Sequence, residues 1–279
     1  MTTLTLPPGL GGERVTALGE RARLCGLYDT LGAPVYDDLA AADGFEIGDI
    51  VSAVRTGAEG PVLDLAAGAG RFTLPLLATG REVTALDLSA DMLDLLRARL
   101  AKAPRPMRER CTVVQGDMAA FDLRRAYGHI VLGTTSLSLL DEAGRAGLYR
   151  SVAAHLAPGG RFLVSVMERA DDDAPTEAHS RVRGASGTAY DLYEYWPAGA
   201  AVRHVTIAPV ETGESEAPGA TGKAAAGPVT VCVDEVGTMS IAAIEAELAE
   251  AGLTIAGRRP LTGMGDRHRV TLLKAVSAR

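Results

Sequence analysis

Three aspartates, each at or just after the end of a short apolar run, have the side chains and spacing best suited to chemistry. Asp64 lies in VLDLAAGAGRFT, Asp87 in ALDLS and Asp117 in VVQGDMAAF. A carboxylate accepts hydrogen bonds, from an ammonium or loop amides at Asp64, from ribose hydroxyls at Asp87 and from an adenine amino group at Asp117. Any one of them could be a cap or turn residue. Three at successive strand ends favour a nucleoside-binding site.

The glycine turn after the first apolar run limits the classes of ligand that could bind there. Gly68 and Gly70 let the backbone turn tightly and approach a ligand. A phosphate loop would end in Gly-Lys-Ser/Thr, which Arg71-Phe72-Thr73 does not supply, and a dinucleotide fingerprint would have Gly or Ala at position 73. Pyrophosphate would also be repelled by the nearby Asp64, whereas a cationic ligand would be attracted.

Alternating strands and helices must position these residues. Apolar runs predict strands at 61–65, 82–86, 111–115, 129–133 and 161–166. Helices are predicted around 45–54, at 72–78, from Ser89 and from Asp141 to Leu156, the last two with a capping side chain at their start. This alternation predicts an α/β fold with a doubly wound parallel sheet. A helix at 241–251 and strands at 253–258 and 268–275 follow.

The pattern changes after Met167. Strands at 188–195, 201–207 and 229–236 have no helices between them, which predicts an antiparallel insertion over about 168–236 that forms a lid or a homodimer surface. Residues 211–228 are a low-complexity loop. Residues 1–20, rich in Thr, Pro and Gly, are predicted to be a flexible arm, and 21–279 a single domain.

Composition excludes several classes of protein. A formal charge of −7 and a pI of about 5.3 argue against a nucleic-acid partner. Cys25, Cys111 and Cys232 form no CxxC pair and no metal-ligand cluster, so three reduced thiols and no metal are expected. The sequence has neither a signal-peptide pattern nor an apolar run of membrane-spanning length. We therefore expect a cytoplasmic protein without a membrane partner.

Five stretches in this order resemble class I S-adenosylmethionine-dependent methyltransferases: DLAAGAGR, ALDLS, QGDM, LGTTS and LAPGGRFLVSV. The resemblance covers residues 28–167, and the last helix and two strands agree with it. It implies a Rossmann-like mixed sheet of about seven strands and S-adenosylmethionine as cofactor. Two positions depart from the family pattern. Ala66 replaces the usual first glycine, and Gly128-His129 stands where an aspartate is frequent before the fourth strand.

The resemblance assigns cofactor contacts residue by residue. The positions are Tyr36, Asp64, Ala66, Gly68, Gly70, Arg71, Asp87, Leu88, Asp117, Met118, Gly133 and Thr134. The turn residues would surround the methionine part, with Arg71 near its carboxylate. Gly133 and Thr134 would face the sulfonium.

For the adenosine part, Asp87 would hold the ribose and Leu88 would contact the adenine. Asp117 and the Met118 amide would read the adenine edge. Upstream, APVYDDLA resembles a segment that closes over the cofactor in small-molecule methyltransferases, which implicates Tyr36 and, as a substrate contact, Tyr28. Both could instead be packing aromatics.

Candidate acceptor contacts gather in TAYDLYEYWP, in a chain that is only 4% aromatic. Tyr193 and Tyr195, if they share a strand face, could line a cation-friendly pocket. Tyr190, in the same segment, is a further candidate substrate contact. Ser136 is a further candidate substrate contact. His204 and Tyr36 are the candidate catalytic residues, although a surface or structural histidine is the simpler explanation for His204. Strand packing is the simpler explanation for Tyr193 and Tyr195.

Methyl transfer from a sulfonium requires mainly alignment. An amine nucleophile must be neutral, and burial beside a positive charge lowers its pKa. Oxygen nucleophiles more often need a base or a metal, and the sequence offers no metal-ligand cluster, so nitrogen is favoured.

GAPVYDDLA, IVLGTTSLSLLDEAGRAGLY and GMGDRHRVTLLKA also resemble methyltransferases of daptide-type ribosomal peptide pathways, which dimethylate a terminal amine. The acceptor is thus expected to be an amine of a peptide or a small natural product. Two alternatives stay open from the sequence. One is O- or C-methylation of a secondary metabolite, and the other is a non-catalytic adenosyl-binding or scaffolding protein.

Overall fold

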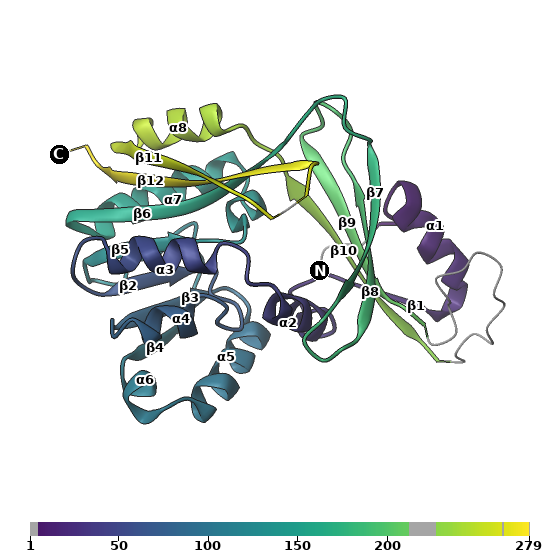
Figure 1. The fold of residues 1–279 in the computed structure, drawn as a ribbon, viewed down its shortest axis with the longest axis horizontal. Coiled ribbons are helices and arrows are strands. Elements are labelled where there is room, and N and C mark those ends of the chain that lie inside the picture. Colours follow the sequence, from purple (N-terminus) through teal and green to yellow (C-terminus); the bar gives the residue numbers. More distant parts are fainter. Residues whose placement is uncertain (1–4, 212–226, 264, 279) are drawn as a thin grey trace. The chain divides into compact units, whose positions relative to one another are not determined.

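The computed structural model describes residues 5–211, 227–263 and 265–278. The chain divides into two compact units (Figure 1). One comprises residues 44–174 and 237–279, and the other comprises residues 1–43 and 175–236. Each unit is built on its own sheet and has its own core. The single domain predicted over 21–279 is therefore two units, and each of them is made from two separate parts of the chain.

The first unit contains a seven-stranded sheet in the order β11-β12-β6-β5-β2-β3-β4. Its strands are β2 (Val62–Leu65), β3 (Val83–Asp87), β4 (Cys111–Gln115), β5 (Tyr127–Leu132), β6 (Leu156–Arg169), β11 (Leu253–Leu261) and β12 (His268–Ser277). The pairs among β2, β3, β4, β5 and β6 are parallel, and β12 pairs antiparallel with both β6 and β11. The predicted mixed, doubly wound sheet of about seven strands is confirmed.

Helices cover both faces of this sheet. They are α3 (Ile47–Arg55), α4 (Thr73–Ala78), α5 (Ala90–Lys102), α6 (Arg105–Glu109), α7 (Glu142–His155) and α8 (Ile241–Glu250). The short 3-10 helix η2 (Ser136–Leu139) follows β5. Figure 1 shows α3 in front of the strands and α7 behind them. Side chains alternate along each strand, so the sheet buries one apolar cluster against α3, α4 and α5 and another against α7 and α8.

Two predicted helix starts have the expected caps. Ser89 Oγ accepts a hydrogen bond from the Met92 amide at 3.3 Å, and Asp141 Oδ1 accepts from the Gly144 amide at 2.8 Å. Each cap satisfies an amide that would otherwise lack a partner in the first turn. These helices therefore start at the residues that the sequence indicates.

The second unit contains a five-stranded sheet in the order β1-β10-β9-β8-β7. Its strands are β1 (Ala22–Cys25), β7 (Glu177–Arg183), β8 (Ala189–Tyr195), β9 (Val202–Pro209) and β10 (Val229–Gly237). The predicted antiparallel pairing holds for β7 with β8 and for β8 with β9. Strands β1 and β7 are absent from the sequence prediction, and β1 pairs with β10 in parallel.

A helix lies on each side of the five-stranded sheet (Figure 1). Helix α1 (Gly9–Leu18), followed by the 3-10 turn η1 (Gly19–Arg21), packs Val15 and Leu18 on one face, and α2 (Ala33–Ala42) packs on the other. The predicted flexible arm over 1–20 is thus wrong for most of its length. Gly11 has no side chain and permits close packing, since a Cβ there would lie 2.5 Å from Thr206 Oγ1.

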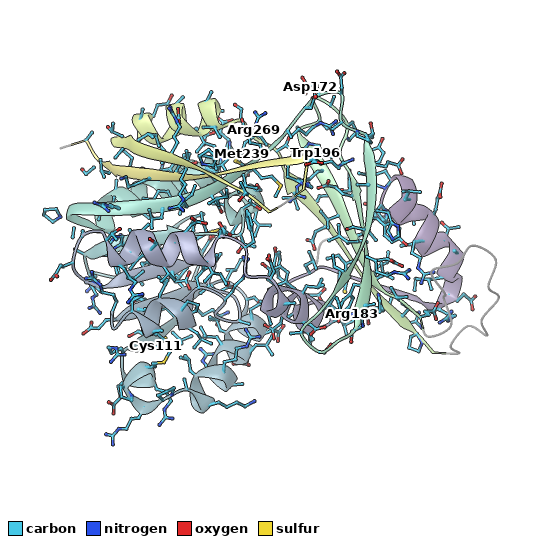
Figure 2. All side chains as sticks on the ribbon, viewed as in Figure 1. Cys111, Asp172, Arg183, Trp196, Met239 and Arg269 are labelled. Atoms are coloured by element: carbon cyan, nitrogen blue, oxygen red, sulfur yellow. The ribbon has the colours of Figure 1, made fainter. Side chains whose placement is uncertain are left out.

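All three cysteines are free thiols. Cys25 and Cys232 are register partners on β1 and β10, and their sulfurs lie 3.5 Å apart. Cys111 lies on β4, at the edge of the seven-stranded sheet (Figure 2). The predicted loop at 211–228 falls mostly outside the described residues. Within the described ranges, no helix combines the length and the apolar character needed to cross a membrane.

Candidate functional site

The carboxyl ends of β2, β3 and β4 bring the three strand-end aspartates to one edge of the sheet. Asp64 is paired with Ala85 in the β2–β3 register, and Asp87 with Gln115 in the β3–β4 register. The Gly116 amide donates to the Asp87 carbonyl at 3.0 Å, which ties the segment before Asp117 to the end of β3. Ligands of open parallel sheets bind at this edge.

The turn between β2 and α4 has a left-handed backbone at three positions. The φ angles are +50° at Ala66, +52° at Gly68 and +92° at Gly70. A Cβ at Gly70 would lie 2.5 Å from Leu96 Cδ1, so packing on α5 requires this glycine. Ala66 adopts the same region with a side chain, which is a strained conformation for an L-residue.

Asp64 lies beneath this turn. The side chain is fully buried, and its Oδ2 accepts a hydrogen bond from Thr73 Oγ1 at 2.5 Å. Its Oδ1 is buried and has no hydrogen-bond partner among the described residues. Burial is the main cause that raises the pKa of Asp64 to about 7; the Thr73 hydroxyl opposes the increase, and the nearby Asp87 contributes to it. Asp64 therefore holds the first turn of α4 from inside, and its Oδ1 is enclosed beneath the glycine turn.

Asp87 is half-buried and holds the glycine turn. Its Oδ2 accepts from the Gly68 amide at 2.7 Å, and its Oδ1 accepts from the Ser89 amide at 2.8 Å. Burial raises the pKa of this carboxyl, and these backbone donors oppose the increase. A carboxylate has about four lone-pair sites, so each oxygen can accept a further hydrogen bond. Two adjacent ribose hydroxyls match that capacity.

Leu88, directly after this carboxylate, is 67% exposed. An apolar side chain exposed beside a polar anchor suits the flat face of a base. Asp117 is exposed and uses its Oδ1 to accept from the Ala119 amide at 2.8 Å, while the Met118 side chain is buried. These residues and the unused acceptors fit a cationic nucleoside such as an adenosyl sulfonium.

The end of β5 adds a fourth element to the edge. A Cβ at Gly133 would lie 2.4 Å from the Phe72 ring, so only glycine fits there. Thr134 and Thr135 both have φ of +55°, and Ser136 starts the 3-10 turn η2. The Thr135 amide donates to Ser165 Oγ at 3.0 Å.

A buried ion pair anchors this loop, and sequence reasoning did not find one of its members. Glu46 Oε1 accepts from the Thr134 amide and lies 3.5 Å from Arg71 Nη1. Arg71 Nη1 also donates to Thr134 Oγ1 at 2.8 Å, and its Nη2 donates to the Phe45 carbonyl at 2.7 Å. Arg71 is thus a structural clamp between the turn after β2, the residues before α3 and the loop after β5. Glu46 precedes α3 without any motif around it.

The aromatic candidates lie in the five-stranded unit, on two different faces of its sheet. Tyr28, Tyr36 and Tyr190 belong to the apolar cluster on the α2 side. The Tyr28 and Tyr36 rings meet edge to face with centroids 5.0 Å apart. Tyr190 donates its hydroxyl to Asp38 Oδ2 at 3.0 Å, and burial raises the pKa of this phenol to about 12.

Tyr193 and Tyr195 do share a face, but it is the opposite one. Tyr193 is stacked on His179 with centroids 4.7 Å apart, and Tyr195 contacts His204 edge to face. His204 is the register partner of Tyr195 on β9, where the alternate residues Val205 and Ile207 point to the α2 side. Tyr190 therefore lies on the other face of the sheet from these two tyrosines.

The only tryptophan of the chain ends the same aromatic segment. Trp196 is buried, its amide donates to the Thr176 carbonyl at 2.7 Å, and the Arg203 guanidinium lies 5.6 Å from its ring centroid. Figure 2 shows Trp196 and Arg183 at opposite ends of the five-stranded sheet. Trp196 therefore fixes one end of this sheet by packing.

The fold and the strand-end acceptors define a class of protein. Residues 62–160 match the methyltransferase domain family. The chain belongs to the class I S-adenosylmethionine-dependent methyltransferases, which use S-adenosylmethionine as methyl donor.

Solved structures are similar to this chain over most of its length. The glycopeptide N-methyltransferase MtfA complexed with S-adenosyl-L-homocysteine is 34% identical, with 98% of this chain and 100% of that chain covered and a TM-score of 0.66. The complex of MtfA with S-adenosyl-L-methionine gives 33% identity, 96% and 98% coverage and a TM-score of 0.65. The CcbJ methyltransferase from Streptomyces caelestis, at 21% identity, 88% and 98% coverage and a TM-score of 0.69, shares the fold. A search of curated protein sequences gave no match. The non-catalytic alternative is not supported by these similarities.

Proposed function

We propose that this methyltransferase transfers a methyl group to the nitrogen of an amine in a peptide or small natural product. The observation that carries the proposal is the 34% identity to a glycopeptide N-methyltransferase over 98% of the chain. A match of that extent includes most of the five-stranded unit as well as the seven-stranded one. In contrast, the methyltransferase domain match stops at residue 160 and supports the donor only.

The donor supplies a methyl group on a positively charged sulfur, and the edge residues would hold it as follows. Asp87 accepts from the ribose hydroxyls, Leu88 contacts the adenine, and Asp117 with the Met118 amide binds the adenine edge. The turn at 66–70 and Thr134 lie at the methionine end. Arg71 is already bonded to Thr134 and Phe45, so we assign it mainly to positioning.

An amine acceptor has to lose its proton before it can attack. A site that removes water and lies near a positive charge lowers the amine pKa, so deprotonation needs no dedicated base. The two catalytic candidates cannot act on the same acceptor atom from one sheet face, because Tyr36 packs on the α2 side and His204 lies on the α1 side. We favour Tyr36 as an acceptor contact, since it is clustered with Tyr28.

The acceptor we propose in more detail is a primary amine at a peptide terminus that receives two methyl groups. Its support is the daptide-type resemblance of three stretches together with the glycopeptide substrate named for MtfA. O- or C-methylation of a small metabolite is the alternative.

The test incubates the purified protein with S-adenosylmethionine carrying an isotopically labelled methyl group. The acceptors are a peptide with a free terminal amine, the same peptide acetylated at that amine, and a phenol. Fragmentation mass spectrometry locates the label. We expect label on the free amine only, and label on the phenol oxygen or on carbon with the free amine untouched would contradict the proposal.

A matched pair of variants tests the acceptor face. Tyr36→Phe removes one hydroxyl on the α2 side, and Tyr195→Phe removes one on the α1 side. If Tyr36 binds the acceptor, its variant lowers kcat/KM for the amine by about tenfold, the value of one hydrogen bond to a charged or polar group. Tyr195→Phe should leave kcat/KM unchanged, and the reverse result would assign the acceptor to the other face.

A further inference from the structure

A cavity lies in the seven-stranded unit, away from the strand-end aspartates. It has a volume of about 230 Å³ and lies between α3 and the strands β6, β11 and β12. Arg161, near the start of the parallel part of β6, and Lys274, near the end of β12, line it. Because β12 runs antiparallel to β6, both cations lie toward the amino ends of the parallel strands, whereas the candidate donor site is at the carboxyl ends.

Strand alternation explains why cations line this cavity. Leu163 and Leu272 belong to the apolar cluster under α3, so Arg161 and Lys274, two residues away along the same strands, point to the same face. Lys274 is the register partner of Leu163, which makes it a diagonal neighbour of Arg161. Gly257 on β11 has no side chain and leaves room for the lysine, because a Cβ there would lie 3.2 Å from Lys274 Cε.

The charges around the cavity do not balance. Asp49, Arg258 and Arg259 also line the cavity. Arg259 is paired with Asp49 and Arg258 with Glu245, so each of these guanidiniums has a carboxylate partner.

Among the residues that the structure describes, Arg161 and Lys274 have no carboxylate within ion-pair distance. The pKa of the His129 imidazole is lowered to about 4, mainly by burial and in addition by the nearby positive charge of Arg161. The cavity thus holds two neighbouring cations whose charges are not compensated, in a protein with a net charge of −7.

We propose that this cavity binds a small oxyanion with two or three negative charges, either inorganic phosphate or a small polycarboxylate. Such an anion relieves the repulsion between Arg161 and Lys274, and the guanidinium binds phosphate and carboxylate oxygens in pairs. Ser52, on α3, lines the same cavity with a hydroxyl group. Leu163 and Leu272 form an apolar floor that lowers the local dielectric and strengthens both contacts.

The test measures the thermal midpoint and the heat of binding for the full chain in phosphate, in citrate and in chloride at equal ionic strength. The variants are Arg161→Gln and Lys274→Gln. The matched control is Lys102→Gln, an exposed lysine at the end of α5 and outside the cavity. The midpoint in chloride and the circular dichroism spectrum show whether each variant is folded.

We expect phosphate, citrate or both to raise the midpoint of the wild type and of Lys102→Gln and to bind with measurable heat. Each cavity variant should lose the increase and bind at least about tenfold more weakly, the effect of one lost charged contact. A response to phosphate alone identifies a phosphate site, and one to citrate alone a polycarboxylate site. Equal stabilisation of all four proteins, which is what anion exclusion from the surface produces, overturns the proposal. Absence of binding heat for both anions also overturns it.

Discussion

Residues with a strained backbone surround the candidate donor site. Ala66, Thr134, Thr135 and Glu46 all have positive φ, and they occupy the turn after β2, the loop after β5 and the residue before α3. A left-handed conformation costs a residue with a side chain about 1–2 kcal/mol. The Glu46 ion pair and its hydrogen bonds hold Thr134 in place against that cost. The edge that would meet the donor is therefore set before a ligand arrives.

Ala66→Gly tests this strain directly. Because glycine adopts φ of +50° without a steric penalty, we expect the variant to be more stable by up to about 1 kcal/mol, after the larger chain entropy of glycine in the unfolded state is subtracted. The measurement is the urea midpoint of both proteins. A midpoint below that of the wild type would show that the methyl group of Ala66 contributes packing that outweighs its strain.

His129 is the residue from which we expect the clearest effect of pH on the stability of the fold. The ring is fully buried on β5, both of its nitrogens lack a partner among the described residues, and burial lowers its pKa to about 4. The unfolded chain, with a pKa near 6.5, binds more protons between these values, so stability is full above pH 6.5 and falls as the pH drops toward 4. The contribution is about 3 kcal/mol at most.

The measurement is the free energy of unfolding across that pH range for the wild type and His129→Leu. The difference between the two proteins isolates the imidazole, since Asp64, whose raised pKa acts in the opposite direction, is common to both. We expect the variant to lose less stability than the wild type as the pH falls. If the free energy of unfolding falls equally in both proteins as the pH drops, His129 is not the cause of the loss of stability in acid.

At the scale of helices and strands, the sequence predicts the part of the chain in which strands and helices alternate. It does not predict β1, β7 or α1. Every strand and nearly every helix between 61 and 169 follows from apolar runs and caps, because each is a local property. Strands β1 and β7 are short or largely exposed, with no apolar run to mark them. Helix α1 contains three glycines, which disfavour a helix in isolation, and it forms because its Val15 and Leu18 are buried on the sheet.

Gly11→Leu tests how α1 is held. The side chain would collide with Thr206 on β9, so we expect the helix to lift from the sheet and the protein to lose about 1–3 kcal/mol. Ala17→Leu, at an exposed position of the same helix, is the control and should change stability little. The thermal midpoint compares the two. An equal effect of both substitutions would contradict the packing described for Gly11.

At the scale of the whole molecule, the chain is assembled from two units that are each discontinuous in sequence. A prediction from local pattern finds the insertion after Met167, but it cannot find that the first 43 residues join it, because the pairing of β1 with β10 spans about two hundred residues. The Glu46–Arg71 ion pair also joins segments that are separated in the sequence. In contrast, the opposite faces of Tyr190 and Tyr193 follow from their odd spacing within one strand. The donor edge was predictable because three strand ends in one parallel sheet must converge.

The measurement that tests the account most directly is the titration of S-adenosylmethionine into the wild type, Asp87→Ala and Asp94→Ala. Asp87 ends β3 with unused acceptors, whereas Asp94 lies exposed on α5 and pairs with Arg97. If the carboxyl edge holds the ribose, Asp87→Ala weakens binding by about 100-fold, the loss of two hydrogen bonds to a charged group, and Asp94→Ala leaves it unchanged. Equal affinity of all three proteins would contradict the assignment of the donor to this edge.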